Sequence, residues 1–294
     1  SLGAVYSLVA IGFVLIFRAT DVLSFAQPAM VVVGAGFISY FATQIGIPFW
    51  IAFFVGIILT GILGFILERT FLRPMVGEPV FSVAVLTIGI DILLRVVLDN
   101  WIGINPKYMG DPFPSFGNFG SLSLGGLTIK YLEVTALVVS LVLIFILSIF
   151  FKKSKYGVAM RATSLDQEAA LAQGINVGRV FGLVWFIAGL LAAFAGFFIT
   201  GGFNTLTNSS FISALRALPA VVIGGLDSIT GAVIGSLIIG LTQAYVGYYQ
   251  FDIESAYNIT LGNGFSIVAP YLIMFIILLI KPHGLFGTEE VERV

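Results

Sequence analysis

The sequence predicts an all-α polytopic transmembrane helical bundle, and its composition supports this fold class in two ways. Of 294 residues, 59% are hydrophobic and 10% are charged, with a mean hydropathy of +1.07. Soluble domains carry roughly 25% charged residues, so this chain cannot cover a water-facing surface. Glycine contributes 34 residues, and small residues let membrane helices approach one another closely. We therefore expect a single transmembrane domain over residues 1–294.

Apolar runs divide the chain into eight or nine predicted segments, some of them broken or re-entrant. A hydrocarbon layer about 30 Å thick requires roughly 20 apolar residues in a helix. The candidate runs are 2–17, 22–42, 47–67, 79–98, 131–150, 180–200, 211–226, 228–250 and 265–280. The seventh run is short and contains Pro219, so we expect a half-helix or a re-entrant segment there.

The placement of basic residues predicts which loops face the cytoplasm. When alternate loops are grouped, ten of the fourteen lysines and arginines fall on one side. The other four are Lys107 and Lys130 on the opposite side and Arg95 and Arg216 within apolar runs. Because cytoplasmic loops carry an excess of basic residues, we expect residues 151–179 and the C-terminus inside the cell. The loop over 99–130 is then extracytoplasmic, and with nine crossings the N-terminus is external.

A polar stretch, "SLDQEAALAQGIN" from Ser164 to Asn176, separates two strongly apolar runs. Ser164 and Gln167 have the spacing of a capping box, "LDQEAALA" favours a helix, and Gly174 suits the position after a helix end. We therefore predict a short, acidic, self-capped helix on the cytoplasmic side. Two interpretations stay open, because such a helix could dock another protein or simply lie on the membrane.

Several polar residues interrupt the apolar segments. Asp91 and Arg95 share one helix face, and ionisable groups at membrane depth face a cavity or each other. They predict either the lining of a path or a self-neutralising pair. Pro28 can break or kink the second segment, as in transporters that expose backbone to a substrate, although packing alone could need that kink. Arg216 either lies at a half-helix end or extends to the membrane interface. The candidates for a translocation path are Ser24, Gln27, Pro28, Thr87, Asp91, Arg95 and Arg216.

Other classes of site find little support in the sequence. There is no G-x-x-x-x-G-K-[ST] stretch, so the chain does not cradle ATP phosphates in the manner of a P-loop. Cysteine is absent, His283 is the single histidine, and no cluster has the spacing of metal ligands. No nucleophile–base set is present either, so we expect no enzyme activity and no bound metal. The net charge of −1 gives no reason to expect nucleic acid.

Blocks of the sequence resemble a known family of membrane transporters. "EAALAQG" resembles the EAA-x-x-x-G loop of ABC-importer permeases, which forms the coupling helix that sits in a cleft of the ATP-hydrolysing subunit. Further blocks are similar, in order, to LivH-type branched-chain amino acid permeases. These blocks are "AVYSLVAIGFVLIF", "VLSFAQ", "LTIGIDILLR", "LRALPAVVIGGLDSITGAVIGSLIIGL" and "KPHGLFGTEEVERV". Residues around Gln27, Asp91 and Arg95 depart from the family's usual ones, so the substrate does not follow from the likeness.

The resemblance implies a permease subunit of an ATP-binding-cassette importer in a bacterial or archaeal plasma membrane. Its expected partners are a second homologous permease, two ABC ATPase subunits, an extracytoplasmic substrate-binding protein and membrane lipid. ATP and Mg would be bound by the ATPases, with no cofactor on this chain. The ATPase-docking residues would be Ser164, Asp166, Gln167, Glu168, Ala169, Ala170 and Gly174. Helix packing, within the chain or at a seam with the second permease, is expected at Gly224, Gly225, Gly231 and Gly235.

The implied substrate is a branched-chain or related small amino acid. Similar-looking permeases carry urea, amides or small organic acids, so these substrates form the first alternative. An ion-coupled secondary transporter is a rival from another class. Such a transporter needs buried acidic or histidine residues for its coupling ion, and Asp91 is the one acid deep in an apolar run.

Overall fold

The computed structural model is largely helical and confirms the all-α polytopic fold. It describes residues 1–103, 107–110, 112, 121–124, 127–201, 205–207, 210–257, 260, 262 and 264–288. Within these residues, seven helices are long and apolar enough to cross a membrane. They are α1 (Leu2–Thr20), α2 (Ala26–Ser39) with η1 (Tyr40–Gln44), α3 (Phe49–Leu67) with η2 (Glu68–Leu72) and η3 (Arg73–Met75), α4 (Val80–Ile102), α5 (Tyr131–Lys153), α8 (Val177–Gly201) and α11 (Ile229–Tyr257).

Shorter helices complete the described chain. They are α6 (Lys155–Leu165), α7 (Gln167–Ala172), α9 (Ser210–Leu215), α10 (Leu218–Gly224) and α12 (Phe265–Ile280). The predicted seventh segment is therefore two short helices, and the break falls at Arg216 and Ala217, just before Pro219. Proline lacks an amide hydrogen but is tolerated in the first turn of a helix, so it begins α10 rather than interrupting it.

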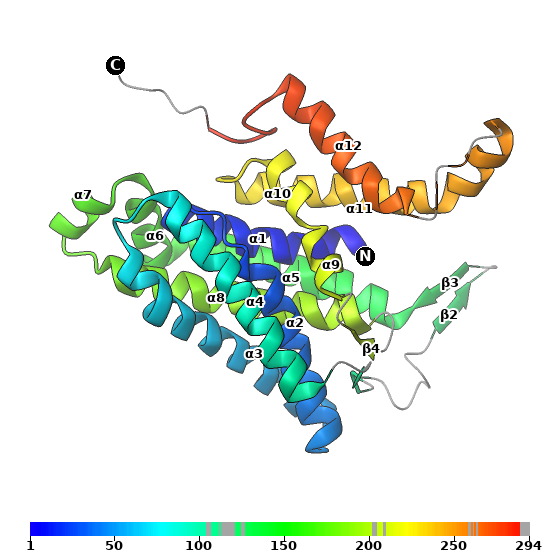
Figure 1. Ribbon diagram of the computed structural model, residues 1–294, viewed down its shortest axis with the longest axis horizontal. Helices are drawn as coiled ribbons and strands as arrows, with labels where there is room; N and C mark the ends of the chain where they lie inside the picture. The colour runs from blue at the N-terminus through cyan, green and yellow to red at the C-terminus, as the bar shows by residue number, and fades with distance from the viewer. Residues whose placement is uncertain are drawn as a thin grey trace.

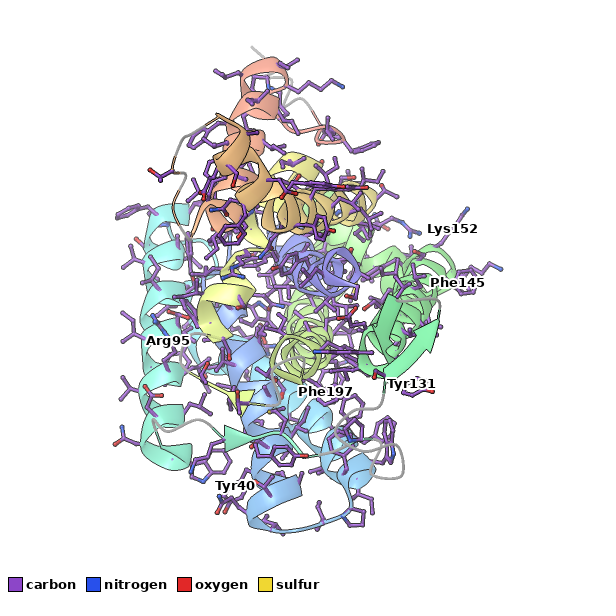
Figure 2. All side chains as sticks on the ribbon, turned by 90° about the vertical axis from the view of Figure 1, so that its right-hand side faces the viewer. Tyr40, Arg95, Tyr131, Phe145, Lys152 and Phe197 are labelled. Atoms are coloured by element: carbon purple, nitrogen blue, oxygen red, sulfur yellow. The ribbon has the colours of Figure 1, made fainter. Side chains whose placement is uncertain are left out.

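The centre of the bundle is formed by α1, α2 and α8. In α1, 83% of the most hydrophobic window is buried, compared with 17% in α5. Helix α1 lies between α11 on one side and α8 on the other (Figure 1). By contrast, Phe145 on α5 is 66% exposed and points away from the bundle (Figure 2). Because the membrane solvates such side chains, α4 and α5 present apolar outer faces to lipid or to another membrane protein.

Glycines let the central helices pack backbone against backbone. A Cβ atom at Gly64 of α3 would lie 2.4 Å from the Trp185 carbonyl oxygen of α8. One at Gly189 of α8 would lie 2.5 Å from the Thr60 carbonyl oxygen of α3. Real Cβ atoms do not approach so closely, so the contact between α3 and α8 requires glycine at both positions.

Two small antiparallel sheets lie at one end of the bundle, where the sequence predicts only an extracytoplasmic loop over 99–130. Strand β1 (Lys107–Tyr108) pairs with β4 (Thr205–Leu206), and β2 (Ser121–Leu124) pairs with β3 (Leu127–Lys130). Open sheet edges need water, so they are tolerated only beyond the hydrocarbon layer. Helix α4 also continues to Ile102, which shortens that loop. The loop residues 104–106, 111, 113–120 and 125–126 lie outside the described part of the chain.

The opposite end of the bundle carries α6, α7 and the segment that follows α12 (Figure 1). A small cavity there is lined by residues from four parts of the chain, including Arg18, Arg161, Ser164 and Ile229. The basic residues expected on the cytoplasmic side and the polar 164–176 stretch therefore share one end of the molecule.

Candidate docking helix and transport path

Helix α7 is the polar mini-helix that the sequence predicts, but its N-cap is different. Asp166, in an extended backbone conformation, accepts the Ala169 amide with its Oδ1 at 2.9 Å. Ser164 is instead the penultimate residue of α6, and its hydroxyl donates to the Arg161 carbonyl. The predicted Ser164–Gln167 capping box is therefore wrong. The chain bends between α6 and α7 at Asp166, and this bend frees the aspartate carboxylate to cap the second helix.

Gly174 ends α7 as predicted. It has a φ of +82°, a conformation that glycine adopts without a Cβ penalty. The Ile175 amide donates to the Ala170 carbonyl, and the Gly174 amide donates to the Leu171 carbonyl. These two bonds are the Schellman pattern, which satisfies carbonyls at a helix end. Helix α7 is thus closed at both ends by its own sequence.

The surface around α7 combines exposed leucines with an acidic residue. Leu165, the last residue of α6, is 87% exposed, and Leu171 of α7 is 58% exposed. Glu168 and Ala169 of α7 are also exposed. Ala170 is buried and anchors the helix. Neither leucine is among the docking residues predicted from the sequence. Their exposure could have been expected, because a leucine in a polar cytoplasmic loop has no hydrophobic core to pack into.

Helix α7 is held rigidly between α6 and α8. Ser154 caps α6 by accepting the Gly157 amide at 2.9 Å, and Arg161 donates to the Phe151 carbonyl at the end of α5. At the other side, the Asn176 side chain accepts the Arg179 amide at the start of α8. Gln167 faces inward and lines a small cavity with Glu68 and Phe181.

The polar residues early in the second segment lie just before α2 or in its first turn, not in the middle of a helix. Because α2 begins at Ala26, Pro28 lies in the first turn, where its missing amide breaks no helical hydrogen bond. The predicted kink at Pro28 is therefore wrong, and the interruption is the non-helical corner between α1 and α2. Thr87 of α4 holds this corner, because its hydroxyl accepts the Phe25 amide at 3.1 Å.

Gln27 lies deep in the bundle, beside the middle of α1 and the middle of α8. It is fully buried, and its Nε2 donates to the Ala188 carbonyl of α8 at 3.2 Å. Gly12 of α1 makes room for it, since a Cβ there would lie 2.1 Å from Gln27 Nε2. Gln27 Oε1 and Ser24 Oγ are buried without a hydrogen-bond partner in the described structure. Unsatisfied polar atoms of this kind are rare in folded proteins.

Asp91 and Arg95 form an ion pair inside the predicted membrane segment. Arg95 Nη2 lies 2.5 Å from Asp91 Oδ2, and Asp91 is almost fully buried. The Arg95 guanidinium also lies over the Phe211 ring of α9, 4.1 Å from its centroid, and Figure 2 shows Arg95 at the surface of α4 that faces α9. Asp91 is therefore neutralised by its neighbour and is not a free carboxylate in this conformation.

Arg216 lies at the break between α9 and α10 and faces two tyrosines. Its neighbours include Tyr6 of α1 and Tyr271 of α12. Tyr6 is buried and donates to Gln243 Oε1 of α11 at 2.8 Å. Within the described residues Arg216 forms no ion pair with a carboxylate, and its Nε is buried without a hydrogen-bond partner. Among the residues that the structure describes, this guanidinium therefore has no carboxylate as a counter-charge.

The path candidates form two groups rather than one pocket. The first group, at the start of α2, consists of Ser24, Gln27 and Thr87. The second surrounds α9, where Phe211 meets Arg95 and the chain then reaches Arg216. Helix α9 thus connects the two arginines that the sequence places inside apolar runs. Within the described residues, no group of three or more histidines or carboxylates could hold a metal ion.

The four candidate packing glycines act within this chain. A Cβ at Gly231 would lie 2.1 Å from the Gly224 carbonyl oxygen, and one at Gly235 would lie 2.1 Å from the Ala220 carbonyl oxygen. These contacts join α10 to α11. Gly225 has a φ of +102° and packs against Gly287 in the segment after α12. That segment also bonds to the end of α10, with Leu285 donating to the Ile223 carbonyl and Phe286 to the Gly224 carbonyl.

Comparison with known proteins places this arrangement in a family. The sequence profile described as "Branched-chain amino acid transport system / permease component" matches residues 1–280. The chain belongs to this family. It is accordingly a transport permease component and a multi-pass membrane protein. The family assignment agrees with the seven membrane-length helices and with the expectation of a transport subunit rather than an enzyme.

Individual relatives match the permease over nearly their whole length. It is 27% identical to the high-affinity branched-chain amino acid transport system permease protein BraD of Pseudomonas aeruginosa, over 100% of this chain and 95% of that protein. It is 29% identical to LivH of Escherichia coli K12, again over 100% and 95% of the two chains. A probable branched-chain amino acid permease LivH of Methanocaldococcus jannaschii is 27% identical, over 96% and 88%. The likeness to LivH-type permeases is thereby confirmed.

Proposed function

We propose that this permease forms the translocation path of an ATP-driven importer for branched-chain or related small amino acids, and that α7 is its contact with the ATPase. The observation that carries this proposal is the surface of α7. The six-residue helix α7, capped at both ends, presents Leu171 and Glu168 to solvent, and Leu165 at the end of α6 is exposed just before it. Exposed leucines at a loop tip favour a protein partner, and fixed caps give that partner a rigid shape to bind.

The importer contains further subunits besides this permease. A second homologous permease, two ABC ATPases and an extracytoplasmic substrate-binding protein complete the importer, with ATP and Mg bound by the ATPases and none by this chain. The end that carries α7 and the C-terminal segment faces the cytoplasm of a bacterial or archaeal cell. The strand pairs then face the binding protein. The excess of lysine and arginine at the α7 end supports this orientation.

The substrate proposal rests on Arg216. An amino acid carries a carboxylate, and a guanidinium without a counter-charge binds carboxylates through two parallel hydrogen bonds. Tyr6 and Tyr271 add hydroxyl groups beside it. The buried, unsatisfied Gln27 Oε1 and Ser24 Oγ are further polar contacts along the path. Urea and simple amides lack a carboxylate, so a path for them has no use for this arginine.

An ion-coupled secondary transporter fits this arrangement less well. Its coupling ion or proton needs a free acidic group at depth. Asp91 and Glu68 are buried acids of the described structure, and each is already paired with an arginine, Asp91 with Arg95 at 2.5 Å and Glu68 with Arg73 at 2.8 Å. The ATPase-driven mechanism instead places the energy source outside this chain.

The test of docking is purification of the tagged permease from its own membranes in mild detergent, followed by mass spectrometry. We expect the native protein to recover P-loop ATPases. Glu168→Lys and Leu171→Glu should abolish that recovery and ATP-driven leucine uptake. Glu78→Lys is the matched control, because Glu78 is an exposed acid outside α7. Unchanged recovery with both α7 variants would disprove the docking role. Leucine uptake into ATP-free vesicles under an ion gradient would favour the secondary transporter.

A further inference from the structure

A cavity of ≈ 470 Å³ lies at the end of the bundle that carries α7, on the seam between α3 and α8. Three arginines line it: Arg69 from η2, Arg73 from η3 and Arg179 from the first turn of α8. None of the path candidates or docking residues lines this cavity. It is therefore a feature separate from both proposed functional surfaces.

One of the three arginines is fixed and two have no acidic partner. Arg73 makes a two-pronged ion pair with the buried Glu68, with its Nε 3.1 Å from Oε1 and its Nη2 2.8 Å from Oε2. It also donates to the Gly178 carbonyl at 2.7 Å. Arg69 and Arg179 are exposed and form no ion pair within the described residues. Glu68 neutralises a single arginine, so the cavity keeps an excess of positive charge.

The backbone adds to this positive potential. Helix α8, 25 residues long, begins at Val177, and Asn176 caps it from the cavity wall. The N-terminus of a helix carries a partial positive charge and free amide groups, which attract anions. An anion in this cavity would therefore meet two unpaired guanidinium groups and the positive end of α8.

The other side of the cavity is apolar and continues into the membrane. Phe65, Leu183 and Phe186 form this side and are half-buried. Beyond them, Ile58, Ile62 and Ile66 recur every fourth residue along α3 and are 51%, 41% and 47% exposed. A stripe at this spacing lies on one face of the helix. The cavity is thus cationic at its outer end and opens toward a lipid-facing hydrocarbon surface.

We infer that this cavity binds an anionic phospholipid, with the phosphodiester between Arg69 and Arg179 and an acyl chain along the exposed isoleucines of α3. Guanidinium groups form strong charge-assisted hydrogen bonds with phosphate, and basic pockets between membrane helices bind anionic headgroups on the cytoplasmic side. A free phosphate would use the arginines but gain nothing from the aromatic wall. An acidic protein surface could bind the arginines but would not contact the exposed isoleucines of α3, which face the lipid. The lipid lies in the inner leaflet in the orientation proposed above, although its binding does not depend on ATPase docking or transport.

The test is a lipid titration of the full chain in detergent, followed by native mass spectrometry. The probes are dioleoyl phosphatidylglycerol and dioleoyl phosphatidylcholine, which share acyl chains and differ in charge. We expect the native protein to bind phosphatidylglycerol at least tenfold more tightly. The double variant R69Q/R179Q should lose this preference. The control K152Q/K153Q removes two exposed lysines at the same end of the bundle, outside the cavity, and should keep it.

Several results would overturn the inference. Equal binding of the two lipids by the native protein would do so without any variant, as would an unchanged preference in R69Q/R179Q. Displacement of phosphatidylglycerol by millimolar inorganic phosphate would indicate a site for free anions. Loss of ATPase recovery in R69Q/R179Q with unchanged lipid binding would assign the arginines to protein docking instead. Because both substituted arginines are exposed and form no ion pair in the described structure, their replacement should leave folding intact, which a monodisperse elution profile checks.

Discussion

The Asp166 carboxylate accepts the Ala169 amide at 2.9 Å and so begins α7, two residues after the serine that the sequence favours as the cap. This relationship separates two residues that spacing alone does not distinguish. A substitution of Ser164 is therefore a matched control for a substitution of Asp166.

Asp166→Ala should loosen α7, whereas Ser164→Ala should not. Loss of an N-cap side chain costs about 1 kcal/mol of helix stability, and a six-residue helix has few other bonds to maintain it. We expect faster amide hydrogen exchange across residues 167–173 in Asp166→Ala, measured by mass spectrometry. Faster exchange in Ser164→Ala and native exchange in Asp166→Ala would restore Ser164 as the cap.

Removing one partner of the Asp91–Arg95 pair should destabilise the protein more than removing both. Asp91→Asn leaves Arg95 without a counter-charge, and breaking a buried pair costs about 3–5 kcal/mol. Arg95 is partly exposed, so we expect a smaller loss, which D91N/R95Q should partly reverse. Thermal unfolding of the two single variants and the double variant measures the coupling. Additive effects of the two substitutions would show that the pair does not stabilise the fold.

Gly235→Ala should impair folding, whereas Gly89→Ala should be neutral or stabilising. A Cβ at Gly235 would lie 2.1 Å from the Ala220 backbone oxygen, which cannot move without separating α10 from α11. A Cβ at Gly89, within α4, meets nothing within 4 Å, and alanine favours a helix by roughly 0.5–1 kcal/mol over glycine. The yield of monodisperse protein and its melting temperature distinguish the two variants. Equal yields and melting temperatures would argue against the tight α10–α11 contact.

Arg216→Gln should weaken leucine transport, with Arg216→Lys intermediate between it and the native protein. A hydrogen bond to a charged group contributes about 1.5–3 kcal/mol, so loss of the guanidinium should raise the KM for leucine roughly 10- to 100-fold. Lysine keeps the charge but not the two-pronged geometry. Uptake of labelled leucine into proteoliposomes that contain the whole importer provides the measurement. Lys153→Gln serves as the control, because Lys153 is exposed at the opposite end of the bundle and is not among the path candidates. Competition by urea, acetamide and short carboxylates tests the alternative substrates. A native KM in Arg216→Gln would remove this residue from the substrate path.

Seven of the nine predicted apolar runs are membrane-length helices in the described structure, because burial in lipid requires long apolar runs. The runs 211–226 and 265–280 form shorter helices instead. The break before Pro219 and the glycine that ends α7 are also predicted, since both follow from local backbone chemistry. The choice between Ser164 and Asp166 is not, because the bend between α6 and α7 decides which side chain faces free amides. Pro28 likewise suggests a kink in the sequence, because its effect depends on where α2 begins, and the sequence does not show that.

Tertiary contacts account for the features that the sequence does not predict. Arg69 and Arg179 come from helices far apart in the chain, and nothing local indicates that they share a cavity. The pairing of β1 with β4 likewise joins segments on either side of α5 and α8. Leu165 and Leu171 could have been identified from the sequence, because both are apolar residues in a polar stretch that is predicted to lie outside the membrane.

The bonds between the last described residues and α10 have a consequence for the order of assembly. Helix α10 has seven residues, too few to be stable alone, and its final carbonyls have no donors within the helix. Leu285 and Phe286 supply those donors, and both are synthesised after α11 and α12. The segment over 210–224, which contains Arg216, therefore depends for its last hydrogen bonds on residues that are synthesised about 60 positions later. A chain that stops before Leu285 would leave this segment open, however well its other helices had inserted.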